Sequence, residues 1–270
     1  MSSDTSPETP TPMSAAPRGA PTPERIAALA DRLRQRRPRI HVLTSPVAQT
    51  FTANMLLALG AEPSMTTSPE EVPAFVTSAD ALLINLGMLD RVRRDASLTA
   101  VDAAKEAGVP WVLDPVKIEI SPSRLDFARR LIDLEPALVH ANHAEFAGLS
   151  GHAAEETAVR DYAVHSISTL VVTGEVDLVT DGKRLVRISN GHPLMDRVTA
   201  MGCAATAIAT AFRAVEPDPI LAATAALVVT GVAGEIAATA AGGPGSFAVE
   251  IVDALYGLDA ETLVERAKIR

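Results

Sequence analysis

The sequence predicts an α/β fold of three layers, in which helices cover both faces of a mostly parallel central sheet. Five apolar runs have the length and β-branched content of strands: residues 39–44, 81–86, 110–114, 137–140 and 169–173. Helical stretches separate or follow them at residues 47–59, 91–107, 123–133, 142–149 and 155–165. Strands that are apolar on both faces and alternate with helices are typical of parallel sheets.

The N-terminal segment differs in composition from the rest of the chain. Residues 1–21 are rich in Pro, Ser, Thr and Ala and offer few apolar side chains to bury, so we expect a disordered tail. Order is predicted to start at Thr22 and Pro23, an N-cap residue followed by proline at the first helical position. Residues 22–270 are predicted to form a single domain.

The last third of the chain completes this predicted domain. Asp181 and Gly182 separate two short apolar runs, a pattern typical of a β-hairpin. From Gly202 onward the sequence is nearly all helical, and its most apolar stretch, Pro219 to Gly234, is too short to span a bilayer. We interpret this stretch as a buried helix and expect no membrane partner.

Composition argues against several functional classes. The 270 residues carry a formal charge of −9, and the dense basic run Arg32 to Arg39 is interpreted as a helix end, so no nucleic-acid partner is expected. Cys203 is the sole cysteine, which excludes an intramolecular disulfide. The N-terminal residues lack the apolar stretch of a signal peptide. These features predict a cytoplasmic protein.

Polar residues gather where the predicted strands end. The clusters are Thr44–Ser45, Asn85–Gly87, Asp114–Pro115, Asn142 with Glu145, and Thr173–Glu175. Open parallel sheets bind ligands at the carboxyl ends of their strands. The clustering therefore indicates an enzyme site at this edge of the predicted sheet.

The segment Val198–Cys203 leads into an alanine-rich helix and suits an anion site. Gly202 is predicted to turn the backbone into the helix, where free N–H groups and the helix dipole favour a phosphoryl group. Cys203, in the first helical turn, is expected to have a lowered pKa and to act as a base. A small buried cysteine at the start of a core helix is the alternative, and spacing alone does not decide between them.

Three other polar segments suggest a functional role, a structural role or both. Asp114 and Glu145, near neighbouring strand ends, suit Mg²⁺ bound between phosphate oxygens. Asn142 and Glu145 fit a helix capping box equally well. Thr173 ends a strand in a turn that suits a nucleotide phosphate, whereas Gly243–Phe247 is interpreted as a turn in which Ser246 caps a helix.

Seven segments follow one another at characteristic spacing within residues 25–265. They are FTANMLLALGAEPSM (51–65), NLGML (85–89), LDPV (113–116), NHAEF (142–146), VTGEVD (172–177), NGHPLM to VTAMGC (190–203) and GPGSF (243–247). In these segments the chain resembles the hydroxyethylthiazole kinases of thiamine salvage, which belong to the ribokinase-like superfamily.

The resemblance implies a ribokinase-like fold and a homotrimer with the thiazole pocket between subunits. It also implies ATP-dependent phosphorylation of 4-methyl-5-(2-hydroxyethyl)thiazole. In such an enzyme Met65 would line the thiazole pocket, and Ala200 would lie in the anion-hole loop beside the substrate alcohol. The resemblance further implies that ATP is contacted by His140, Asn142 and Thr173, and that Mg²⁺ is held by Asp114 and Glu145. It implies that the catalytic base is Cys203, beside the loop glycine Gly202.

Several positions depart from the residues usual in that family. Ser45-Pro46 replaces Asn-Asn, Lys117–Ile120 replaces a run of Gly and Ala, His140-Ala141 replaces Arg-Gly, and Ala200 replaces Gly. These changes leave the fold prediction untouched. They keep two alternatives open: a kinase for another small heterocyclic alcohol, and a non-catalytic ligand-binding relative.

Overall fold

A computed structural model describes residues 19–270, which are organised around one eight-stranded sheet. The strand order is β2-β1-β3-β4-β5-β6-β7-β8; the first six strands are parallel, and β7 and β8 are antiparallel. The strands are β1 (Arg39–Leu43), β2 (Glu62–Ser64), β3 (Ala81–Asn85), β4 (Trp111–Asp114), β5 (Leu138–Asn142), β6 (Thr169–Thr173), β7 (Asp177–Thr180) and β8 (Leu185–Ile188). The predicted mostly parallel sheet is confirmed, whereas most of the predicted tail, residues 1–18, lies outside the described residues.

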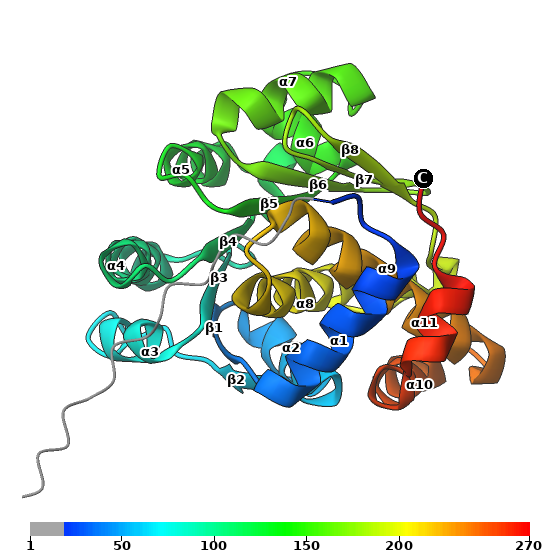
Figure 1. Cartoon of the computed structure of the whole chain (residues 1–270). Helices are drawn as coiled ribbons and strands as arrows, with labels where there is room; N and C mark the ends of the chain where they lie inside the picture. Colours follow the sequence, from blue (N-terminus) through cyan, green and yellow to red (C-terminus); the bar gives the residue numbers. More distant parts are fainter. Residues whose placement is uncertain (1–18) are drawn as a thin grey trace, which may run out of the picture.

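Helices cover both faces of this sheet (Figure 1). One face carries α3 (Val72–Ser78), α4 (Arg91–Ala107), α5 (Pro122–Ile132), α6 (His143–Ser150) and α7 (Glu156–Ser166). The other carries α8 (Met201–Val215) and α9 (Pro219–Ala240), with α1 (Pro23–Arg36), α2 (Pro46–Leu59), α10 (Pro244–Gly257) and α11 (Ala260–Arg266) packed outside them. Two short 3-10 turns, η1 (Ile118–Ile120) and η2 (Pro193–Arg197), complete the list.

Local sequence signals account for most helix boundaries. Thr22 caps α1 by accepting a hydrogen bond from Arg25 N, and Pro23 fixes the first turn. Gly60 and Gly108 end α2 and α4 in the left-handed conformation, with φ of 103° and 67°, which costs glycine little. Sequence patterns therefore predict these boundaries well.

Two short elements, β2 and α3, were not predicted. Strand β2 has three residues, Glu62-Pro63-Ser64, with little β propensity, and it forms because it lies at the sheet edge beside β1. Proline is tolerated there because an edge strand does not need every N–H for pairing. Helix α3 has seven residues, and it buries only Val72 and Val76. Neither element is long enough to show a periodic pattern.

Helix α9 forms the apolar centre of its layer. Its side chains are buried along most of its length, and its first turn is capped by Asp218, which accepts a hydrogen bond from Ile220 N. By length and composition it would be able to cross a membrane, yet 89% of its most apolar window is buried inside the fold. Small residues permit this close packing, since a Cβ at Gly231 would lie 2.6 Å from the Cβ of Asn190. The predicted buried helix is confirmed.

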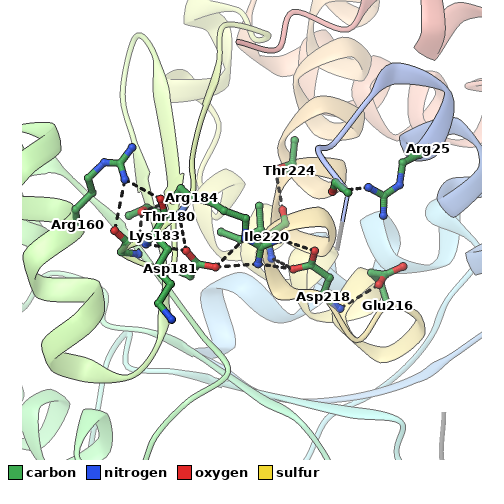
Figure 2. A network of polar contacts seen from close by, with 12 residues as sticks. Arg25, Arg160, Thr180, Asp181, Lys183, Arg184, Glu216, Asp218, Ile220 and Thr224 are labelled. Carbon is green, nitrogen blue, oxygen red and sulfur yellow. Dashed lines mark hydrogen bonds and ion pairs between the residues drawn. The ribbon is translucent and has the colours of Figure 1, made fainter. Parts of the chain in front are cut away.

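A polar network ties the predicted hairpin of β7 and β8 to the start of α9 (Figure 2). It lies at the end of the sheet where the parallel strands begin, called here the amino edge. The Arg184 guanidinium donates two hydrogen bonds to Asp218, at 2.7 and 2.9 Å, and one to Asp181. Asp218 N donates to Glu216, which in turn accepts from Arg32 of α1 at 2.6 Å. This network, hereafter the amino-edge network, links a hairpin turn with two helices.

Candidate functional site

The carboxyl ends of the parallel strands bring several predicted site residues into one row. Asn85 pairs in register with Asp114 across β3 and β4, and Asn142 pairs with Thr173 across β5 and β6. Thr44, directly after β1, is buried, and its hydroxyl has no hydrogen-bond partner within residues 19–270. The prediction that polar strand ends would meet at this edge is correct for these residues.

Asp114 is the most perturbed carboxyl group of the row. Asn85 Nδ2 donates to Asp114 Oδ2 at 2.6 Å. Burial, and next the negative charge of Glu145, raise the pKa of Asp114 from 3.8 to about 8, although hydrogen bonds from Asn85, Thr206 and Cys203 oppose the rise. A cation beside the two carboxylates would favour the ionised form of Asp114.

Glu145 fulfils the structural interpretation, a capping box. Its N–H donates to Asn142 Oδ1, and its Oε2 accepts from Asn142 N, both at 2.9 Å. Its other oxygen, Oε1, accepts from Lys117 N at 2.9 Å, which joins the loop after β4 to α6. The capping role and a role near a cation are compatible, because a carboxylate has about four lone-pair sites.

The turn into α8 is made by Ala200 and not by Gly202. Ala200 is the N-cap, with φ of 69° in the left-handed region, and the helix begins at Met201. Gly202 lies inside the first helical turn, so the prediction that it turns the backbone is wrong because the helix starts one residue earlier. A Cβ at Gly202 would meet nothing within 4 Å, and no side chain caps the helix. The helix start therefore has the open space that an anion needs.

Cys203 does not have the lowered pKa that its place in a helical first turn predicts. Burial, and next the negative charge of Asp114, raise the pKa of the thiol to about 12. Position in the helix is visible in the sequence, but the carboxylate from another strand is not. The expectation of a thiolate at neutral pH is therefore wrong, whereas the place of Cys203 beside Asp114 agrees with a site role.

Two of the predicted nucleotide contacts, Asn142 and Thr173, lie at the ends of β5 and β6, and the third, His140, lies in the middle of β5. The Thr173 hydroxyl donates to Ala141 O at 3.5 Å, a long hydrogen bond that leaves the group available to a ligand. The next turn packs against α6, since a Cβ at Gly174 would lie 2.7 Å from His143 Nε2. His140 is buried in β5, and burial lowers its pKa to about 4. Its imidazole is therefore neutral at pH 7.

Met65 lies toward the other end of the row, just after β2. Strand β2 is three strands away from β4, so at about 4.8 Å per strand the end of β2 lies about 14 Å from Asp114. Met65 is half-buried against the core on the α8 and α9 side. Within one chain the structure groups Asn85, Asp114, Glu145 and Cys203, and it leaves Met65 apart from them.

Two further findings concern the helices around this edge. Helix α10 begins at Pro244 after Gly243, so Ser246 is not its N-cap, because the proline sets helical geometry earlier. The Ser246 hydroxyl accepts from Gly242 N and donates to Gly243 O, two residues that precede the helix. Arg93 of α4 is buried beside the loop after β3, and no sequence pattern singled it out. The available signal was its spacing with Ala96 and Ala100 on the buried face of α4.

Comparison with known proteins assigns the chain to a family. The model of the hydroxyethylthiazole kinase family matches residues 30–261. The chain belongs to this family. It is 46% identical over 259 residues to hydroxyethylthiazole kinase of Granulibacter bethesdensis, with 91% of this chain and 94% of the relative covered. It is 45% identical over 249 residues to the probable hydroxyethylthiazole kinase of Agrobacterium fabrum, with 92% and 96% covered.

Solved structures agree with this assignment. The hydroxyethylthiazole kinase protein of Pyrococcus horikoshii OT3 superposes with a TM-score of 0.87 at 37% identity, covering 91% of this chain and 98% of that one. Pyridoxal kinase of Bacillus subtilis, solved as an ADP complex, gives a TM-score of 0.57 at 17% identity, covering 73% and 91%. The second likeness concerns the fold alone, and the predicted ribokinase-like fold of this kinase family member is confirmed.

Proposed function

We propose that this protein uses ATP to phosphorylate the hydroxyl group of 4-methyl-5-(2-hydroxyethyl)thiazole in thiamine salvage. The observation that carries the proposal is the grouping of Asp114, Glu145 and Cys203 at the open start of α8, in a chain that belongs to the hydroxyethylthiazole kinase family. Phosphoryl transfer depends mainly on positioning and on electrostatic stabilisation of the phosphate oxygens. A helix start beside carboxylates that favour a cation is suited to both tasks.

The residues present fit Mg²⁺ held jointly by the protein and by phosphate. Within residues 19–270 no three His, Cys, Asp or Glu side chains converge to hold a metal ion by themselves. Magnesium is commonly bound through one or two carboxylates, waters and substrate phosphates, which matches Asp114 and Glu145. The raised pKa of Asp114 also fits, since burial and next the repulsion between the two carboxylates disfavour its ionised form, and a cation would offset both. When bound, the ion would neutralise charge on the phosphate oxygens.

The other site residues would bind and orient the two substrates. Backbone N–H groups at Gly202 and Cys203 would hold the transferring phosphoryl group, with the α8 dipole adding to the attraction. The Cys203 thiol would meet the substrate alcohol and orient it for attack. Thr173 and Asn142 would contact ATP at the ends of β6 and β5, with His140 beside them as a neutral group.

We also propose a homotrimer in the cytoplasm with the thiazole pocket shared between subunits. The support is the separation of about 14 Å between the end of β2 and Asp114, which leaves Met65 free to line the pocket of a neighbouring copy. Exposed apolar side chains on α2 and α10, such as Leu57 and Tyr256, offer surface for such an assembly. Light scattering of the purified protein tests this: a monomer at micromolar concentration would contradict it.

A substrate screen tests the proposed reaction. Purified protein is given ATP and Mg²⁺ with the thiazole alcohol, pyrimidine alcohols or sugar alcohols, and the phosphorylated product is identified by mass spectrometry. We expect the thiazole alcohol to give the highest kcat/KM. Preference for another heterocyclic alcohol would favour the first alternative, and binding without ATP turnover for all of them would favour a non-catalytic relative.

A further inference from the structure

A buried arginine holds the loop that follows β3. The Arg93 side chain, in the first turn of α4, is 5% exposed. Its Nη2 donates to Asn85 O at 2.8 Å, and its Nη1 donates to Met88 O at 2.9 Å and to Gly87 O. One guanidinium thus binds three carbonyl oxygens within a four-residue stretch.

No ion pair within the described residues accounts for this burial. Burial lowers the pKa of Arg93; the charge of Asp90 opposes this effect and the charge of Arg124 adds to it. The Asp90 carboxylate itself accepts from Arg93 N as the N-cap of α4. A buried cation is costly unless its hydrogen bonds are satisfied. Here the backbone of one loop accepts from Nη1 and Nη2, whereas the buried Nε has no hydrogen-bond partner within residues 19–270.

That loop sets the position of a site residue. Asn85 donates to Asp114 through Nδ2, and its Oδ1 accepts from Gly87 N at 3.0 Å. Gly87 lies close to Ser45, since a Cβ on it would be 3.6 Å from the Ser45 side chain. Met88 has φ of 48°, a strained conformation for a residue with a side chain. The three carbonyl contacts of Arg93 therefore surround the turn that aims the Asn85 amide at Asp114.

We propose that Arg93 is a positioning residue, whose guanidinium fixes the carbonyls of residues 85–88 and so holds the Asn85 amide against Asp114 and the Gly87 backbone against Ser45. It touches neither substrate. Its effect on turnover rests on the proposed kinase function, whereas its effect on the loop does not. Lysine is a partial substitute, because it retains the charge but lacks the planar fork that reaches several carbonyls at once.

The first test is kinetic and uses the full chain with ATP, Mg²⁺ and the thiazole alcohol. We expect Arg93→Met to lower kcat and to raise the KM for the alcohol, so that kcat/KM falls about tenfold or more, since small misplacements at a site cost up to about 10²-fold. The KM for ATP should stay unchanged, because Asn142 and Thr173 lie on other strands. Arg93→Lys should recover part of the loss. Arg91→Met, an exposed charge removed from the same helical turn, is the control and should resemble wild type.

The second test is amide hydrogen exchange without substrates. The Gly87 N–H is protected by Asn85 Oδ1, so loosening the loop in Arg93→Met should speed its exchange about tenfold, with Arg91→Met unchanged. Unchanged Gly87 exchange in folded Arg93→Met would overturn the inference. So would a loss of activity that merely follows the folded fraction, with both KM values constant. If wild type has no activity on the alcohol but exchange changes as expected, the proposed reaction fails and the positioning role stands.

Discussion

Two groups of carboxylates lie at opposite edges of the sheet and differ in their partners. In the amino-edge network, Asp218 and Glu216 bind Arg184 and Arg32. At the carboxyl ends of the parallel strands, Asp114 lies near Glu145 and accepts a hydrogen bond from the Asn85 amide, and within residues 19–270 no arginine or lysine forms an ion pair with it. Hydrogen bonding to Asp218 is the largest cause that raises the pKa of Arg184, whereas burial and Glu145 raise that of Asp114.

The difference separates a group that holds the fold together from a group that we propose binds a cation together with the substrate phosphates. Paired charges stabilise each other in the native state, so the amino-edge network is satisfied by the chain itself. Buried like charges destabilise the native state until a cation arrives. Substitutions in the two groups are therefore expected to have opposite effects on stability and on activity.

Asp114→Asn is expected to have the largest effect on activity. Turnover should fall on the order of 10²–10³-fold, because an amide supplies no negative charge for the cation. The stability of the folded protein should increase. The folded pKa of Asp114, about 8, lies above its usual 3.8, so its stabilising contribution is full below pH 4 and is lost as the pH rises through 8. Melting curves at pH 5 and pH 8 test this. From pH 5 to pH 8 the melting temperature of wild type should fall relative to that of Asp114→Asn. A variant that melts at a lower temperature than wild type at pH 8 would contradict the prediction.

Replacements of Cys203 come next. Cys203→Ala should lose on the order of 10²-fold in turnover, because it removes the group that we propose orients the alcohol. Cys203→Asp should keep or raise turnover, since a carboxyl ionises far more readily than a thiol whose pKa is about 12. Cys203→Ser should resemble the alanine variant. Steady-state kinetics of the three variants decide the matter, and an alanine variant as active as wild type would leave Cys203 with a packing role only.

Asp218→Asn tests the other side of the comparison. It should destabilise the fold by about 2 kcal/mol, less than a fully buried pair because Arg184 is partly exposed. That corresponds to a fall in Tm of roughly 4–8 °C. The turnover of the folded enzyme should not change. Asp181→Asn, at the more exposed end of the network, is the matched control and should cost less. If Asp218→Asn lost turnover without losing stability, the amino-edge network would contribute to activity and not to stability.

Ala200→Gly gives the smallest expected effect. Relief of the positive φ should stabilise the protein by about 1 kcal/mol. Part of this gain is offset because glycine raises the conformational entropy of the unfolded chain. Glu135→Gly, at another positive φ of 61° on the surface, is the control and should stabilise to a similar extent. Chemical denaturation measures both. A less stable Ala200→Gly variant, beside a stabilised Glu135→Gly, would mean that the Ala200 methyl group makes contacts worth more than the strain.

Long elements with clear periodicity were predictable from the sequence, and short ones were not. The five buried parallel strands and the Asp181-Gly182 hairpin follow from apolar runs and turn chemistry. Strand β2 and helix α3 depend on tertiary neighbours, since three and seven residues carry little pattern of their own. Ser246 was assigned as a cap by residue type, although Pro244 already sets the helix.

For the site, the sequence predicts which residues meet but not how they affect one another. Asn85 and Asp114 were both found at strand ends, and parallel pairing brings them together. The pKa of Cys203 was predicted in the wrong direction because it is raised by burial and next by the charge of Asp114, which comes from a distant part of the chain. The function of Arg93 depends on three carbonyl groups, and backbone atoms leave no signature in a sequence.

The apolar helix α9 also bears on how the chain reaches its fold during synthesis. Outside the protein, a segment of this length and hydropathy would partition into lipid or bind chaperones. Its position in the chain reduces that risk, because all eight strands precede Pro219. Domains are synthesised from the N-terminus at about 5–20 residues per second, so the sheet that receives α9 emerges seconds earlier. The order of the elements thus supplies a burial surface before the segment that most needs one appears.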